Sequence, residues 1–121
     1  MLFRSADYGC DFLTNSEDAL CFIDRVKTAG VGLHLDAGGM TLAGEDPVVV
    51  CMNARRHWRH FHASDPFLAP IGSGTDHDAM GNALRLSGYR GWVSLEMRQP
   101  PSDDWLDTLI LSLQRVRTAY E

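Results

Sequence analysis

The sequence predicts an α/β fold that is part of a (β/α)8 barrel, with about three βα units and four helices. Two observations support this. Apolar runs near 31–36, 58–64 and 91–96 alternate with segments of helical periodicity, which is typical of parallel strands with right-handed crossovers. Each run ends in a potential metal ligand, and the runs lie roughly thirty residues apart, about one βα unit. Because the C-terminal ends of parallel strands open onto one face, the sequence predicts one site built from three segments.

One face of the predicted sheet is polar, which is a further reason to expect a barrel. Its side chains would be His34, Asp36, His60, His62, Ser94 and Glu96. A parallel sheet is normally covered on both faces. If all four helices pack on the apolar face, these polar groups suit the mouth of a barrel better than a core. We therefore interpret residues 6–121 as the C-terminal half of a barrel domain, and residues 1–5 as a non-native or disordered leader.

The first helix is expected to follow Thr14 and Asn15, because Thr14 and Glu17 have capping-box spacing. Gly30 is placed to end it. The apolar stripe of this helix comprises Ala19, Leu20, Phe22, Ile23 and Val26. Residues 31–36 then read as a buried strand.

The Gly38-Gly39 pair predicts a break after this strand. Asp46 and Pro47 predict the start of the second helix, since proline at the first helical position loses no hydrogen bond. The expected apolar side of this helix comprises Val48, Val49, Cys51 and Met52.

Residues 58–64 read as the second strand, followed by a long loop over 66–75. Within that loop, residues 72–74 (Gly-Ser-Gly) are compatible with a phosphate-binding turn, but a short GxG is a weak signal and an active-site loop is favoured. Asp76 is expected to cap the third helix and Gly88 to end it. The buried face of that helix comprises Met80, Ala83 and Leu84.

Residues 91–96 read as the third strand. Pro100 and Pro101 exclude an immediate helix, so the last helix is expected to start at Ser102 or Asp103. Its apolar side comprises Trp105, Leu106, Leu109, Ile110, Leu113 and Val116.

The composition excludes several classes of protein. The chain has 121 residues and 45% hydrophobic content, which suits one globular domain or part of one. A net charge of -5 and a pI near 5.4 argue against a nucleic-acid partner. No apolar run approaches the roughly 18 residues of a membrane span, and no signal-peptide core is present, so a cytoplasmic location is expected. Cys10, Cys21 and Cys51 form no CxxC pair and are expected to be reduced thiols.

The three strand ends carry the residue types of a metal site. Taken singly, an aspartate after a strand usually caps a turn, and a strand-end glutamate is usually solvated. Together, Asp36, His62 and Glu96 would offer one nitrogen and two carboxylates, a set that suits Mn²⁺, Co²⁺, Mg²⁺ or Zn²⁺. Side chains two apart on a strand share a face, so His34 and His60 become candidates for substrate binding.

The same segments resemble a known family, the sugar phosphate isomerase/epimerase group of the xylose isomerase-like TIM barrels. The resemblance runs from about residue 8 to residue 97. It is carried by 31–38 (VGLHLDAG), 60–65 (HFHASD) and 88–97 (GYRGWVSLEM). Residues 71–74 (IGSG) lie where the family has a Pro-Gly-x-Gly loop.

The resemblance implies a divalent metal held by a Glu, an Asp, a His and a second Glu on successive strand ends. Asp36, His62 and Glu96 match the last three of these ligands. The first Glu has no match and would lie just upstream of Tyr8. Several epimerases of the family also carry a substrate-contacting His where this chain has Gly39.

In functional terms, the resemblance implies a metal-dependent isomerase or epimerase of a small sugar or sugar phosphate. Such an enzyme removes the proton alpha to a carbonyl through an enediolate, with Glu96 as both ligand and acid/base. The open alternatives are an inosose-type dehydratase of the same superfamily and an inactive half-barrel fragment. An endonuclease IV-like zinc hydrolase is disfavoured, because few basic residues are present to hold DNA. The expected partner is a small sugar or polyol, with no nucleic acid and no membrane; a homo-oligomer is left open.

Overall fold

The computed structural model describes residues 6–101 and 103–121. The predicted leader (residues 1–5) and Ser102, one of the two expected helix starts, lie outside the described residues. The α-helices and strands run in the order α1 (Ser16–Val26), β1 (Leu33–Asp36), α2 (Ala37–Leu42), α3 (Pro47–Ala54), β2 (Trp58–Ser64), α4 (His77–Ser87), β3 (Val93–Glu96) and α5 (Trp105–Tyr120). Two single 3-10 turns, Ala6–Tyr8 and Pro66–Leu68, complete the described elements.

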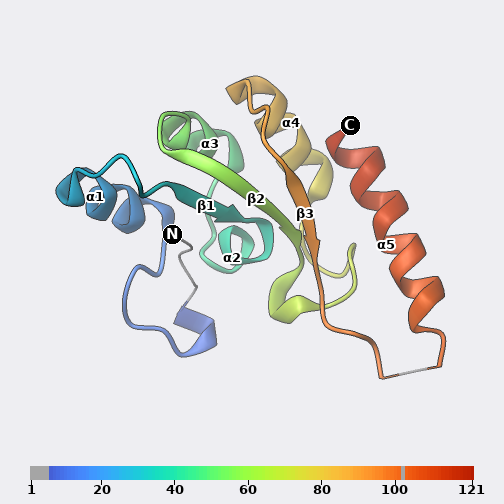
Figure 1. Cartoon of the computed structure of the whole chain (residues 1–121). Coiled ribbons are helices and arrows are strands. Elements are labelled where there is room, and N and C mark those ends of the chain that lie inside the picture. Colours follow the sequence, from blue (N-terminus) through green and yellow to red (C-terminus); the bar gives the residue numbers. More distant parts are fainter. Residues whose placement is uncertain (1–5, 102) are drawn as a thin grey trace.

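The three strands form one parallel sheet in the order β1-β2-β3, which confirms the predicted α/β fold (Figure 1). Asp36 on β1 is paired with His62 on β2, and Ser64 on β2 is paired with Glu96 on β3. Because side chains alternate along a strand, all four lie on the same face near the C-terminal ends of the strands.

The opposite face of the sheet is apolar and carries the core. Leu33, Leu35 and Phe61 have no exposed surface. The side chains packed with them come from α1 (Ala19, Ile23), α3 (Val50, Cys51, Ala54) and α4 (Met80, Ala83, Leu84). A second cluster joins Ala63 of β2 to Val116 of α5. These helices therefore cover the apolar face, as predicted, and leave the polar face of β1, β2 and β3 without a covering helix among the described residues (Figure 1).

The structure corrects the boundaries of α1. The cap is Asn15 rather than Thr14, because the Asn15 side chain accepts a hydrogen bond from the amide of Asp18 at 2.8 Å. The helix ends at Val26, and not at Gly30. Lys27 adopts a left-handed conformation (φ 50°) and its amide closes the last turn on Ile23.

The predicted break at Gly38-Gly39 is wrong. Both glycines lie inside a short α-helix, α2, which the sequence did not predict. Asp36 caps this helix by accepting from the amide of Gly39 at 2.6 Å, which offsets the poor helix propensity of glycine. The structure also starts α5 later than expected, at Trp105 after Asp104. The second strand and the caps at Asp46, Asp76 and Gly88 are confirmed.

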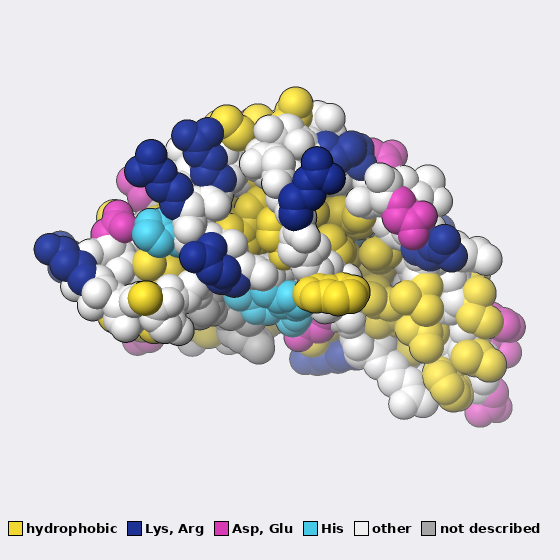
Figure 2. Space-filling view, turned by 45° about the horizontal axis from the view of Figure 1, so that its top comes forward, with side chains coloured by type: hydrophobic (Ala, Val, Ile, Leu, Met, Phe, Trp, Pro, Cys, Tyr) yellow, Lys and Arg dark blue, Asp and Glu magenta, His cyan; other side chains and the backbone are white. Residues whose placement is uncertain are grey.

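The apolar side expected for α3 is mostly wrong. Val48, Val49 and Met52 are exposed, and the buried positions are Val50, Cys51 and Ala54. Within α5, Val116 is buried, whereas four apolar residues of the predicted stripe are 42–51% exposed: Trp105, Leu106, Ile110 and Leu113. Hydrophobic side chains accordingly gather over α5 at the right of Figure 2. Among the described residues, no helix combines the length and apolar character needed to cross a membrane.

Gly81 allows α4 and α5 to approach closely. A Cβ at this position would lie 1.9 Å from the carbonyl oxygen of Ala119, a backbone atom of α5. We expect Gly81→Ala to lower the free energy of unfolding by about 1–3 kcal/mol, because this clash exceeds the gain in helix propensity. Urea unfolding followed by circular dichroism measures the change, with exposed Asn82→Ala as the matched control. Equal stability of the two variants would contradict the close approach.

Candidate metal centre

Asp36 is held in place by two hydrogen bonds at the end of β1. One carboxylate oxygen, Oδ1, caps α2 through the amide of Gly39. The other, Oδ2, accepts from the hydroxyl of Ser64 at 2.8 Å, and that hydroxyl in turn accepts from the amide of Gly38 at 2.9 Å. The side chain is therefore a helix cap and a candidate ligand at once. Ser64, whose role the sequence reasoning missed, lies two residues beyond His62 on the same face.

The structure brings the three predicted ligands together. The Nδ1 atom of His62 lies 2.7 Å from Oε2 of Glu96 and 3.9 Å from Oδ2 of Asp36. One ligand atom from each of the three residues lies within 4.8 Å of the others. The set has one imidazole nitrogen and two carboxylate oxygens, which is the mixed donor set of Mn²⁺, Co²⁺, Mg²⁺ or Zn²⁺. We call these three residues the mixed centre.

Burial and charge at the mixed centre favour a cation. Burial raises the pKa of Asp36, and the nearby carboxylate of Glu96 raises it further, although the hydrogen bonds from Gly39 and Ser64 act in the opposite direction. Two carboxylates close together on a partly buried surface repel each other when both are ionised. A divalent cation would compensate both effects, so these residues fit a bound metal.

His34 and His60, the predicted substrate-binding residues, lie beside the mixed centre. The ring centroid of His34 is 3.9 Å from that of His62 and 4.9 Å from that of His60. Burial, together with the neighbouring histidines His62 and His60, lowers the pKa of His34 to about 4. Burial also lowers the pKa of His60, with His62 adding to the effect. The His34 ring is therefore neutral at neutral pH, and the shift at His60 favours the neutral ring as well.

A buried carboxylate, Asp65, holds the loop that follows β2, and the sequence reasoning gave it no role. Its Oδ1 accepts from the amides of Gly74 at 2.6 Å and Thr75 at 2.7 Å. Its Oδ2 accepts from the amide of Gly72 at 2.8 Å. Asp65 has no exposed surface. The Gly-Ser-Gly turn thus directs two of its amides at a protein carboxylate, and these are the donors that a phosphate-binding turn would need.

Asp65 also anchors two helices through His77. The Nε2 atom of His77 lies 3.0 Å from Oδ2 of Asp65, and its Nδ1 atom lies 2.8 Å from the hydroxyl of Tyr120 on α5. Burial would raise the pKa of Asp65, but the hydrogen bonds from His77 and the loop amides outweigh burial and lower the pKa. The ionised carboxylate therefore stabilises the junction of the loop with α4 and α5.

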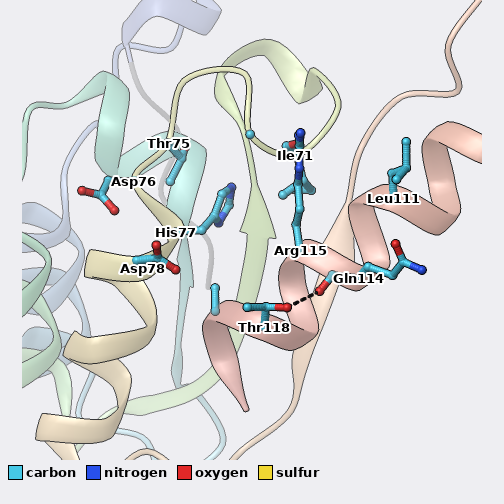
Figure 3. Close-up of a pocket in the computed structure, with 11 residues that line it drawn as sticks. Ile71, Thr75, Asp76, His77, Asp78, Leu111, Gln114, Arg115 and Thr118 are labelled. Atoms are coloured by element: carbon cyan, nitrogen blue, oxygen red, sulfur yellow. Dashed lines mark hydrogen bonds between the residues drawn. The ribbon is translucent and has the colours of Figure 1, made fainter.

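A cavity of about 460 Å³ lies on the helix side of this junction, between α4, α5 and the loop (Figure 3). Its lining includes His77, Leu111 and Arg115. The Arg115 guanidinium donates to the carbonyl of Ile71, which ties the loop to α5. No residue of the mixed centre lines this cavity, so the polar face of the sheet, and not the cavity, is the candidate site.

Two curated proteins are similar to part of the chain. The rhizopine catabolism protein MocC of Rhizobium meliloti is 27% identical, with 66% of this chain and 33% of MocC covered. An inosose dehydratase of Lacticaseibacillus casei is 28% identical, with 66% of this chain and 36% of the dehydratase covered. The chain therefore matches about a third of the length of these relatives.

Solved structures of sugar epimerases share the fold of the chain. D-Psicose 3-epimerase from Clostridium cellulolyticum H10, solved with D-tagatose, matches with a TM-score of 0.87 at 17% identity, covering 100% of this chain and 48% of the epimerase. The 3-keto-D-glucoside 4-epimerase YcjR from E. coli matches with a TM-score of 0.80 at 25% identity, covering 90% of this chain and 41% of that protein. The three βα units thus superpose on part of a sugar epimerase barrel.

The family comparison covers nearly the whole chain. The family model of the xylose isomerase-like TIM barrel matches residues 5–116. This range includes all three strands and the mixed centre, and it agrees with the resemblance of the strand-end segments. The chain therefore belongs to the xylose isomerase-like TIM barrel family.

Proposed function

We propose that the chain supplies the divalent-metal centre of an enzyme that isomerises or epimerises a small sugar or sugar phosphate. The observation that carries this proposal is the convergence of Asp36, His62 and Glu96 at the C-terminal ends of three adjacent parallel strands. That edge of a barrel is where its enzymes carry out their chemistry. The likeness of the fold to two sugar epimerases supports the same class of substrate.

The residues divide the chemistry between them. Asp36 and His62 would hold the cation, and Glu96 would be both ligand and acid/base. The bound cation, Mn²⁺, Co²⁺, Mg²⁺ or Zn²⁺, would supply a Lewis acid that stabilises the negative charge of an enediolate. Glu96 keeps a side-chain exposure of 33%, so a substrate on the open face can reach its carboxylate, which removes the proton alpha to the carbonyl. His34 and His60, as neutral imidazoles, would contact substrate hydroxyls.

A dehydratase is the second candidate, favoured by the similarity to inosose dehydratase. It begins with the same removal of an alpha proton from a keto sugar or keto polyol. The hydroxyl on the adjacent carbon then leaves with a proton, as water, so the product is lighter by one water. The two reactions therefore need the same centre and differ only in the step after proton removal.

The chain alone is not expected to complete this reaction. We propose that residues 6–121 form the C-terminal half of a barrel domain, in line with the 41–48% of the solved epimerases that the chain covers. The resemblance places one further glutamate ligand, and the second acid/base, before Tyr8. The 121-residue chain by itself would then bind metal weakly and turn over no sugar, and catalysis would need the complementary half.

Proton exchange in D2O tests the proposed function. The complete barrel, incubated with a panel of ketoses, ketose phosphates and inososes, is expected to incorporate deuterium alpha to the carbonyl in at least one substrate. Added chelator should stop the exchange, and Mn²⁺ or Co²⁺ should restore it. Mass spectrometry separates isomerisation from loss of water. Exchange that persists after complete metal removal, or zinc-dependent cleavage of phosphodiesters in its place, would refute the proposal.

A further inference from the structure

Three histidines form a second group that is able to hold a cation. His34, His60 and His62 each offer one ring nitrogen, and these three atoms lie within 4.8 Å of one another. The rings meet edge to face, with interplanar angles of 70–83°. We propose that this group is an imidazole-only site for a borderline-soft divalent cation such as Zn²⁺ or Cu²⁺, and that it shares His62 with the mixed centre.

An unpartnered nitrogen points to this site. Nε2 of His34 is buried and has no hydrogen-bond partner among the described residues. A polar atom buried in this way is costly unless something binds it. The His34 ring instead meets the rings of His60 and His62 edge to face, and one ring nitrogen from each of the three lies within 4.8 Å of the others. A cation between the three rings would give this atom the partner that it lacks.

The geometry requires only a small closure of the rings. Zinc holds imidazole nitrogens at about 2.0–2.1 Å, so two nitrogens on one tetrahedral ion lie roughly 3.3 Å apart. The three candidate atoms are already within 4.8 Å of one another. His60 and His62 are only partly buried on the open face, so their side chains have room to rotate toward His34. Histidine side chains reach the surface in this part of the molecule in Figure 2.

The donor atoms set the selectivity between the two sites. Three imidazoles suit Zn²⁺, Cu²⁺ or Ni²⁺, whereas a set that includes two carboxylates suits Mg²⁺ or Mn²⁺. His62 belongs to both groups, so a cation held by the three imidazoles and a cation in the mixed centre would draw on the same ring. Zinc would therefore compete with magnesium for this face. The imidazole site stands on its own geometry, and only the competition rests on the proposed function.

Ring nitrogen NMR on the unaltered chain tests the site. The chain has five histidines, and two of them are internal controls: His57, beside Asp24 at 3.3 Å, and His77, bound to Asp65. In the ¹⁵N-labelled chain, Zn²⁺ is expected to shift the ring signals of His34, His60 and His62 together and to leave the two controls in place. Mg²⁺ is expected to shift the signals of His62 alone. The imidazole site would be overturned if Zn²⁺ shifted the ring signals of His62 alone, or shifted the signals of His57 and His77 equally.

Substitutions give an independent readout by calorimetric titration with each metal. His60→Gln and His34→Gln are expected to weaken Zn²⁺ binding by about tenfold or more, because the loss of even an outer partner of a metal ligand costs 10–100-fold. Both should leave Mg²⁺ affinity unchanged. Asp36→Asn should instead weaken Mg²⁺ binding and leave Zn²⁺ affinity unchanged. His57→Gln is the matched control for loss of a histidine. Unchanged zinc affinity in His34→Gln and His60→Gln contradicts the inference. Shifts of all three rings by Zn²⁺ without any response to Mg²⁺, Mn²⁺ or Co²⁺ would support it while refuting the mixed centre in this chain.

Discussion

Glutamine at position 96 is expected to lower turnover of the complete enzyme by roughly 10²–10⁴-fold, the usual contribution of a positioned acid/base. The amide keeps the shape of Glu96 but can neither accept a proton nor balance the charge of a cation. The carboxylate also lies 2.7 Å from the His62 ring, so its loss should free that imidazole to rotate. Deuterium incorporation in D2O measures the proton-transfer step directly, and Mn²⁺ titration of the chain measures the loss of a ligand.

The control for this substitution is Glu17→Gln on the exposed side of α1, which removes the same charge away from the polar face. It should leave both the exchange rate and the Mn²⁺ affinity unchanged. Full activity of the Glu96→Gln enzyme would exclude Glu96 as acid/base and with it the proposed mechanism. Lost metal affinity with normal exchange at saturating Mn²⁺ would show that Glu96 is a ligand only.

Alanine in place of Asp65 is expected to produce the largest loss of stability, about 3–5 kcal/mol in the free energy of unfolding. The substitution removes a fully buried carboxylate and leaves three loop amides and His77 without their acceptor. Urea unfolding followed by circular dichroism gives the value. Asp11→Ala, at an exposed position, should change stability by only about 0.5 kcal/mol or less. A loss below about 1 kcal/mol for Asp65→Ala would mean that the loop is not held by this network.

The same carboxylate sets a pH dependence of stability. The pKa of Asp65 is lower in the folded chain than in the unfolded chain, so ionisation favours folding. This contribution is complete above the unfolded pKa, about 3.9, and is lost as the pH falls through the lower folded pKa. Unfolding free energies measured between neutral pH and acid should therefore decline more steeply for the wild type than for Asp65→Asn. Parallel curves would contradict the lowered pKa.

Local signals in the sequence predicted much of the fold. The capping aspartates Asp46 and Asp76 and the terminating Gly88 act through backbone groups within four residues, so their effect is visible in a short stretch of sequence. The polar residues of the three strand ends are widely separated along the chain, yet strand alternation and parallel topology were sufficient to place them together. The mixed centre was predicted because its geometry follows from the topology of the sheet.

The sequence was less informative where the outcome depends on distant packing. In α3, three consecutive valines leave the buried side undetermined, because the choice among them depends on how α3 packs against α1 and α4. The helix α2 was missed because Gly38 and Gly39 have poor helix propensity, whereas its cap is Asp36, a residue that belongs to the preceding strand. The role of Asp65 was missed for a similar reason, since its acceptor contacts are to backbone amides, which no residue type signals.

The anchoring of the loop by Asp65 has a consequence for which positions of the loop tolerate substitution. Asp65 binds the amides of the Gly-Ser-Gly turn from the core side, whereas the side chain of Ser73 is exposed and bonds only within the turn, to the carbonyl of Pro70. The course of the loop backbone is therefore independent of the side chains on its outer surface. Substitutions of those outer side chains should therefore leave the loop backbone, and the candidate metal centre on the neighbouring strands, in place.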